Sequence, residues 1–196
     1  MNSLRIVIVL AVALLASACL PVTTSTPVGS TVGFQADPAL SGIWRGEQAK
    51  AEGPVFVSFY PQTDGTVSVV GMSAPGKSDS GGWAVYSMQT AALGSYHFMN
   101  AREVSDNGKA SSIPDNAGTF PLLYRVNTDG ALVIYLLDEN ATKAAIQSGK
   151  IAGTVQQGQF GDIAVTAAPA DLDAFMQSPA GRALFVKPLL ILKRVK

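Results

Sequence analysis

Residues 120–137, FPLLYRVNTDGALVIYLL, give the clearest indication of the fold of this chain. Two strand candidates, 120–126 and 131–137, flank Asn127-Thr128-Asp129-Gly130, where Asp-Gly favours a tight hairpin turn. The second strand is apolar on both faces, so both of its faces must be covered. We expect the interior of a barrel to cover one face, and a helix or a neighbouring chain to cover the other.

Short strands of the same kind precede and follow this hairpin. In residues 54–60, Val55, Val57 and Phe59 alternate with more polar positions, as in a half-buried strand. The folded part is expected to open near Leu40, with a first strand around Trp44. Further strands are predicted at 66–70, 83–88, 96–103, 151–155, 161–166 and 188–195, with a polar, mobile loop at 105–118.

Two short helices are expected in the C-terminal third. Asp138 can cap a helix over 139–148 that Gly149 ends, with Ala141, Ala144, Ala145 and Ile146 as its apolar stripe. A second helix is expected over 171–177, with Leu172, Phe175 and Met176 on one side. The pattern predicts a mainly β fold: an antiparallel meander closing into a barrel of about eight strands, or alternatively a β-sandwich.

Composition is typical of one folded unit, which we place at residues 39–196. The chain is 47% hydrophobic and only 14% charged, which is ample for a core. Fourteen basic and fourteen acidic residues cancel without forming a long run, so the charge pattern of a nucleic-acid-binding protein is missing. Cys19 is the only cysteine, so no disulfide can form within the chain.

The N-terminus has the layout of a secretory leader. Arg5 precedes an uncharged apolar run, Ile6 to Leu15, which ends in Ala16-Ser17-Ala18 before Cys19. This segment resembles the lipobox of bacterial lipoproteins. The resemblance implies a signal peptide over 1–18, cleavage before Cys19, diacylglycerol on the Cys19 sulfur and a palmitate-type acyl chain on the new amino terminus.

The same resemblance implies a location in the bacterial cell envelope. Leu20, in place of Asp, favours the outer membrane, with the protein facing the periplasm and the lipid as its membrane partner. The alternatives are a soluble exported protein cut after Ala18, and an uncleaved anchor that is short for the roughly 20 residues that span a bilayer. Residues 19–38, rich in Pro, Thr, Ser and Gly, are expected to be a flexible linker reaching about 60 Å when extended.

A second resemblance concerns the folded part. Gly42-Ile43-Trp44 on the first strand, a helix before the last strand and Arg194 near its end resemble the pattern of lipocalins. In that family the tryptophan plugs one end of an eight-stranded barrel and the arginine packs across its ring, so the resemblance implies a Trp44–Arg194 pair. The additional helix after Asp138 and the lack of a disulfide depart from the family pattern.

One stretch of the sequence matches a nucleotide-binding motif. Residues 71–78, GMSAPGKS, fit the phosphate-loop pattern, which requires a helix beginning at Lys77 and Ser78. The sequence instead continues into Asp79-Ser80-Gly81-Gly82 and an alternating strand, so a glycine-rich strand connection is the prediction and nucleotide binding a remote alternative.

Other signs of catalysis are absent from the sequence. His97 is the only histidine, and no cluster with metal-ligand spacing or nucleophile elbow occurs. We therefore predict a protein that is not an enzyme and needs no cofactor or metal.

The function expected is a non-catalytic binding or accessory domain. Its aromatic residues could line a site for a small apolar ligand, or they could simply fill the core. In the second case the domain would be a structural or assembly accessory that docks an envelope protein, and surface exposure of Tyr60, Tyr86 or Leu137 would be its sign.

Overall fold

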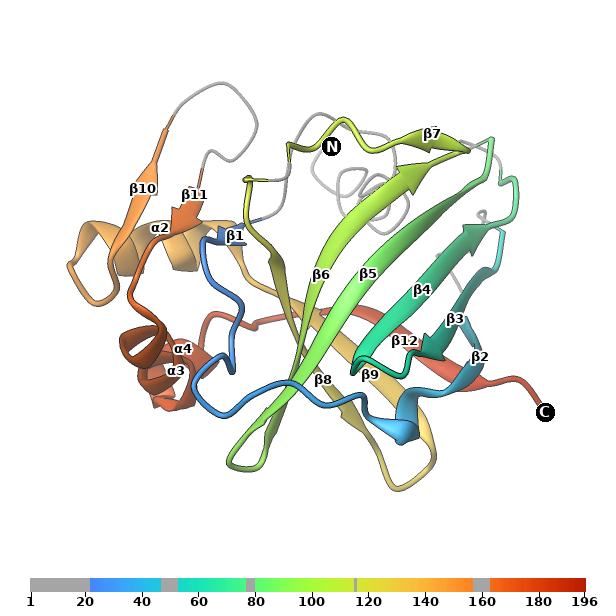
Figure 1. Cartoon of the computed structure of the whole chain (residues 1–196), viewed down its shortest axis with the longest axis horizontal. Coiled ribbons are helices and arrows are strands. Elements are labelled where there is room, and N and C mark those ends of the chain that lie inside the picture. Colours follow the sequence, from blue (N-terminus) through green and yellow to red (C-terminus); the bar gives the residue numbers. More distant parts are fainter. Residues whose placement is uncertain (1–21, 47–52, 77–79, 115, 157–162) are drawn as a thin grey trace, which may run out of the picture.

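The fold is a closed antiparallel barrel with a smaller layer of helices and strands on one side (Figure 1). The structure is a computed structural model, and it describes residues 22–46, 53–76, 80–114, 116–156 and 163–196. Eight strands close the barrel in the order β5-β4-β3-β2-β12-β9-β8-β6, because β5 also pairs with β6. The barrel, rather than the alternative sandwich, is therefore the correct fold.

The barrel strands follow the sequence in a near-continuous meander. Their bounds are β2 Gly42–Gly46, β3 Val55–Pro61, β4 Thr66–Ser73, β5 Gly82–Leu93, β6 Tyr96–Asp106, β8 Phe120–Val126, β9 Ala131–Leu136 and β12 Pro188–Arg194. The short β7, Lys109–Ala110, pairs with the end of β6, and the 3₁₀ helix η1, Pro38–Leu40, precedes β2. We call the two ends of the barrel the η1 end and the β7 end.

Alternating side chains fill the barrel. Val55, Val57 and Phe59 are buried, as their alternation predicts. Strand β9 sends Leu132 and Ile134 inward to the same cluster. The buried interior cluster consists of Leu40, Trp44, Val55, Val57, Phe59, Val67, Val69, Ala84, Met88, Met99, Ala101, Phe120, Leu122, Tyr124, Leu132, Ile134 and Leu192.

A side layer covers the outer faces of β6, β8 and β9. It contains a three-stranded sheet, β1 Thr23–Thr24, β11 Ile163–Val165 and β10 Gly153–Val155, and the helices α2 Glu139–Gln147, α3 Pro169–Gln177 and α4 Pro179–Arg182. Phe98 of β6 is fully buried in this second core, and Tyr135 and Leu137 pack into it as well. The expectation that 131–137 is covered on both faces is thus confirmed.

Local sequence explains where the elements turn. Gly130 has a φ of +78° and donates its N–H to Asn127 O at 2.9 Å, which closes the β8–β9 hairpin. Asp138 caps α2 by accepting the Ala141 N–H at 2.8 Å, and Gly149, at a φ of +70°, follows its end. Within α2, buried Thr142 takes the place that we expected for exposed Ala144.

The flexible linker expected over residues 19–38 is wrong for the part that the structure describes. Val22, Thr24 and Val28 are buried, and Thr24 exchanges two backbone hydrogen bonds with Thr119 at 2.9 and 3.0 Å. We call residues 22–37 the strap. It runs from beside the start of β8 to η1 (Figure 1), so residues well before Leu40 belong to the packed fold.

The loop expected over 105–118 is also partly wrong. Strand β6 continues to Asp106 and turns through Asn107 and Gly108, both at positive φ, into β7. Asn107 tolerates this left-handed conformation better than most residues, and its side chain also accepts the Trp83 N–H at 3.0 Å.

Candidate functional site

Two polar side chains bind the N-terminal half of the strap, at residues 28–31. Asn100, buried on the outer face of β6, accepts the Val28 N–H at 2.7 Å and donates to Val28 O at 2.8 Å, as a neighbouring strand would. Asp173 of α3, only 2% exposed, accepts the Gly29 N–H at 2.6 Å, the Thr31 N–H at 3.0 Å and the Thr31 hydroxyl at 2.5 Å. Since a buried carboxylate requires such partners, its burial depends on the strap.

The C-terminal half of the strap, residues 32–37, crosses the barrel at the η1 end. Gln35 donates its N–H to Thr90 O at 3.0 Å, and the Thr90 hydroxyl donates to Gln35 O. Asp37 accepts the Tyr124 hydroxyl at 2.7 Å with one carboxylate oxygen, and the Ala39 N–H at 2.8 Å with the other. These contacts fix the strap at Gln35 and Asp37.

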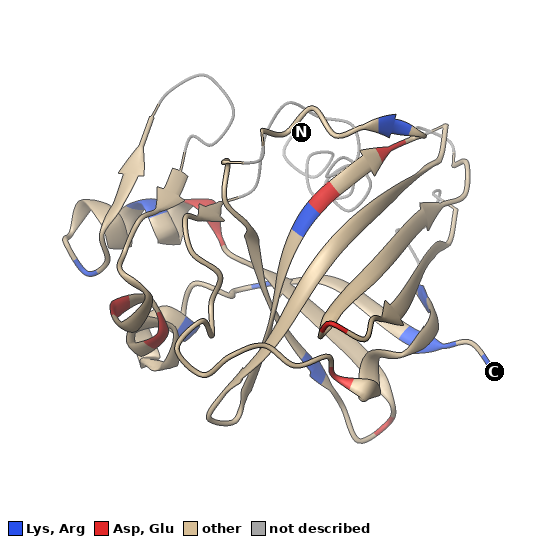
Figure 2. Ribbon diagram, viewed as in Figure 1, with Lys and Arg blue, Asp and Glu red and all other residues tan. Residues whose placement is uncertain are grey.

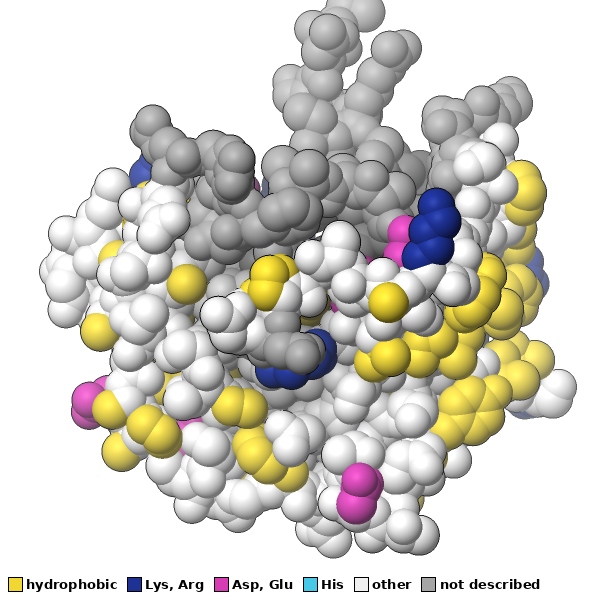
Figure 3. All heavy atoms as spheres, turned by 45° about the horizontal axis from the view of Figure 1, so that its top comes forward, with side chains coloured by type: hydrophobic (Ala, Val, Ile, Leu, Met, Phe, Trp, Pro, Cys, Tyr) yellow, Lys and Arg dark blue, Asp and Glu magenta, His cyan; other side chains and the backbone are white. Residues whose placement is uncertain are grey.

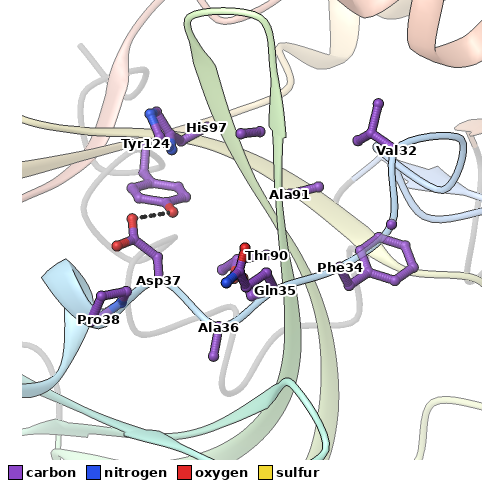
Figure 4. A pocket seen from close by; sticks show the side chains of 12 residues that line it. Val32, Phe34, Gln35, Ala36, Asp37, Pro38, Thr90, Ala91, His97 and Tyr124 are labelled. Atoms are coloured by element: carbon purple, nitrogen blue, oxygen red, sulfur yellow. Dashed lines mark hydrogen bonds between the residues drawn. The ribbon is translucent and has the colours of Figure 1, made fainter.

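A hollow of about 520 Å³ lies between this half of the strap and the ends of β5, β6 and β8. Figure 4 shows the strap residues crossing it, with His97 and Tyr124 on one side and Val32 and Phe34 on the other. Its full lining is Val32, Gly33, Phe34, Gln35, Ala36, Asp37, Pro38, Thr90, Ala91, Ala92, His97 and Tyr124. The volume falls in the range of sites for small molecules, roughly 300–1,000 Å³.

The polar groups of the hollow have distinct roles. Burial and the Asp37 carboxylate both raise the pKa of Tyr124, so its hydroxyl stays protonated and acts as a donor to Asp37. The His97 ring lies 5.5 Å from the Tyr124 ring, centroid to centroid, at a tilted angle. Among the described residues no group hydrogen-bonds to the His97 ring nitrogens, which leaves them available to a bound molecule.

Trp44 and Arg194 meet at the η1 end, as the lipocalin resemblance implies. The Arg194 guanidinium lies 4.3 Å from the centroid of the Trp44 ring, a distance at which cation–π attraction operates. Arg194 also donates to Ala39 O at 2.6 Å and to Ser41 O, while Trp44 Nε1 donates to Leu40 O at 2.8 Å. The pair thereby ties η1 across this end of the barrel.

A second group of polar side chains lies toward the β7 end. Tyr86 of β5 packs beside the interior cluster and faces Glu103 of β6 in the strand register. Burial raises the pKa of Glu103, although the Ser111 hydroxyl donates to it at 2.8 Å and partly opposes this effect. Burial, followed by the charges of Glu103 and Asp106, raises the pKa of Tyr86, and these groups give the interior a polar rim.

The phosphate-loop pattern does not form a nucleotide cradle in the described residues. Gly71 lies inside β4, paired with Val57 on one side and Ala84 on the other, and Ala74 donates its N–H to Pro54 O at 3.0 Å. The segment returns into β5 at Gly82, as a strand connection does. Lys77 and Ser78, like the lipid-attachment candidate Cys19, lie outside the described residues.

The described residues contain neither a cluster of metal ligands nor a membrane-spanning helix. The described part of the chain brings no three His, Cys, Asp or Glu side chains together as metal ligands. Among these same residues, no helix combines the length and the apolar character needed to cross a bilayer.

Sequence reasoning missed the residues that hold the strap. Asn100 and Asp173 lie far from it in the sequence and bind its backbone groups, while Asp37 within it binds the Tyr124 hydroxyl. The Pro, Thr, Ser and Gly content of residues 19–38 predicts a flexible linker and hides the apolar anchors Val22 and Val28. The partial signal was His97 between Tyr96 and Phe98, a polar side chain in an aromatic strand.

The molecule therefore presents a closed eight-stranded antiparallel barrel, a strap across it and a hollow beneath the strap. Comparison of the chain with protein-family models, with curated proteins and with solved structures found no significant match.

Proposed function

We propose that this protein is an exported, lipid-anchored protein of the bacterial envelope and that its barrel is a non-catalytic binding module. In this proposal residues 1–18 are a signal peptide, Cys19 carries the lipid, and the protein faces the periplasm from the outer membrane. The support is the leader ending at the single cysteine of the chain. The lipocalin-like arrangement of Trp44, Arg194 and η1 on an eight-stranded barrel supports a binding role.

The observation that carries the binding role is the hollow beneath the strap. Its wall combines the apolar side chains of Val32, Phe34 and Ala91 with the ring nitrogens of His97, to which no described residue hydrogen-bonds. This mixture suits a small, mainly apolar molecule with one hydrogen-bonding group. Large side chains of the interior cluster occupy the barrel between Trp44 and Phe120, so we place the ligand under the strap instead of in the barrel centre.

Binding is tested with a fluorescent amphiphile and a variant that fills the hollow. The probe is 1-anilinonaphthalene-8-sulfonate, titrated into the Cys19→Ser protein. Ala92→Phe places a ring in the hollow from an exposed position. Because this ring takes up space that the probe needs, we expect saturable binding to weaken at least about tenfold, which is about 1.4 kcal/mol of binding free energy.

The matched control is Ser95→Phe, which adds the same ring at an exposed turn position outside the hollow and is expected to bind like the parent. Equal binding by both variants, or no saturable binding by the parent, would count against the hollow as the site. Mass spectrometry of compounds that co-purify with the native protein then identifies the natural ligand.

The second candidate function is a structural or assembly accessory. It is favoured by Tyr60, which is 50% exposed, whereas Tyr86 is half-buried and Leu137 is buried. An accessory would dock an envelope protein through exposed apolar residues and leave the hollow unoccupied.

A further inference from the structure

We infer that the β7 end of the barrel lies on a phospholipid surface, with Trp83 and Met72 in the headgroup region. This inference rests on the proposed lipid anchor at Cys19 and adds the partner surface and the orientation of the domain. Three observations carry it: how close to Cys19 the domain holds the chain, in which direction the strap runs from there, and which side chains are exposed on the β7 side of the barrel.

Val22, the first residue that the structure describes, lies only three residues after Cys19. Val22 is 3% exposed and the next two residues pair with β11, so the domain holds the chain firmly from this point. Three extended residues reach about 10 Å. An acylated Cys19 would therefore keep Val22 close to the bilayer, where a flexible linker to residue 38 would have allowed about 60 Å.

The strap enters the domain beside the start of β8 and runs from there toward η1. Thr24 bridges Thr119, which directly precedes β8, and Phe120 at the start of β8 pairs with Ala101 in the middle of β6, so the chain before Thr24 lies on the side of the strap away from η1. In Figure 1 the label β1 lies beside β11 and α2, and the blue chain runs down from it before it crosses toward β2. The short connection to Cys19 thus turns the β7 end toward the membrane and the η1 end, with its hollow, toward the aqueous side.

The wall formed by β3, β4 and β5 near this end is uncharged, whereas Asp106 of β6 and Lys109 of β7 lie at the end itself. Strands β3, β4 and β5, all described, contain no Asp, Glu, Lys or Arg, and their ribbons are tan in Figure 2. Met72 and Trp83 face each other across β4 and β5 near the β7 end and are 42% and 41% exposed; Val104 of β6 is 50% exposed. Figure 3 shows hydrophobic side chains gathered on this side of the molecule.

These side chains suit the interface of a bilayer better than water. An indole ring combines apolar surface with an N–H donor, and tryptophan is enriched at the level of lipid headgroups. Trp83 is also held in place, because its backbone N–H and carbonyl both bond to Asn107, at 3.0 and 2.8 Å. An indole side chain has only two rotatable bonds, so it loses little conformational entropy on contact with lipid.

Tryptophan quenching by brominated lipids tests the orientation. The full-length acylated protein is reconstituted into vesicles of phosphatidylethanolamine and phosphatidylglycerol with dibrominated chains. The chain has two tryptophans, and Trp44 is 1% exposed at the η1 end. We expect the brominated lipid to lower the emission and the Trp83→Phe variant to lose this quenching.

The control moves the indole to the opposite end. Val126, 43% exposed at the η1 end of β8, is replaced by Trp in the Trp83→Phe protein and is expected to remain unquenched. Quenching of Val126→Trp as strong as that of Trp83 would overturn the orientation.

The mass of the N-terminal peptide from the same sample separates the two claims. An unmodified mass overturns the anchor itself. An acylated peptide together with unquenched Trp83 overturns the orientation alone. The wall with Met72 and Trp83 would then be a contact surface for a protein and not for lipid.

Discussion

At the scale of single residues, Arg194 links the last strand of the barrel to the segment before the first. Its guanidinium stacks on the buried Trp44 ring and donates to the carbonyls of Ala39 and Ser41. Sequence resemblance could identify this pair because both residues occupy fixed positions at the ends of strands. It could not identify the η1 carbonyls, since backbone groups leave no mark in a sequence.

Replacing Arg194 tests this link. Arg194→Ala removes the cation–π contact and two hydrogen bonds, so we expect the free energy of unfolding to fall by about 1–3 kcal/mol. Lys193→Ala, at an exposed neighbouring position, is expected to change it by less than about 0.5 kcal/mol. Urea unfolding of the Cys19→Ser protein measures both, and equal effects would contradict the role of Arg194.

Glu103 makes the stability of the fold depend on pH. Burial raises its pKa in the folded state above the ordinary value, so the folded protein binds a proton more readily than the unfolded chain. Its contribution to stability is therefore fully present below the ordinary pKa and is lost as the pH rises through the raised value.

Glu103→Gln keeps the acceptor for Ser111 and removes this titration. We expect the variant to gain stability over the parent at pH 7 relative to pH 4, by less than about 1 kcal/mol because the side chain is partly exposed. Urea midpoints at the two pH values measure the change. A parent protein and variant with parallel pH profiles would argue against it.

At the scale of elements, the barrel strands could be predicted and the strap could not. Residues 55–61 and 120–126 alternate or run apolar in ways that only strands satisfy, and Asp138 and Gly149 mark the ends of α2 chemically. The strap has no period of its own. Its order comes from Asn100 and Asp173, which lie about 70 and 140 residues further along the chain.

Asp173→Asn tests what holds the strap. The neutral amide weakens the hydrogen bonds to Gly29 and Thr31 and turns a donor toward at least one of them, so we expect a loss of about 2–3 kcal/mol. Hydrogen exchange should accelerate at the Gly29 and Thr31 amides and remain unchanged in β3. Asp171→Asn, exposed on the same helix, is the control and should leave both protected.

At the scale of the whole molecule, two cores share the strands between them. Strand β6 sends Met99 into the barrel and Phe98 into the side layer, and β9 divides its side chains in the same way. The sequence indicated this double burial for 131–137 but not the second sheet that covers it, because β1 and β11 pair across about 140 residues.

Such sharing predicts one cooperative unfolding transition. Leu172→Ala removes a fully buried side chain from the side layer and is expected to cost about 2–5 kcal/mol. Urea unfolding followed by hydrogen exchange at amides of β4 in the barrel and of α3 in the side layer should give coincident transitions. Two separate transitions would mean that the side layer unfolds independently.

The strap also determines where this protein can be cut for recombinant work. A boundary drawn from composition would fall near residue 38 and would discard Val22 and Val28. The shortened product would keep every barrel strand. It would leave the Asp173 carboxylate without its hydrogen-bond donors and would expose the apolar surface along β6 that Val22 and Val28 cover. Poor solubility of such a fragment would then reflect a missing piece of the native fold, and expression should begin upstream of Val22.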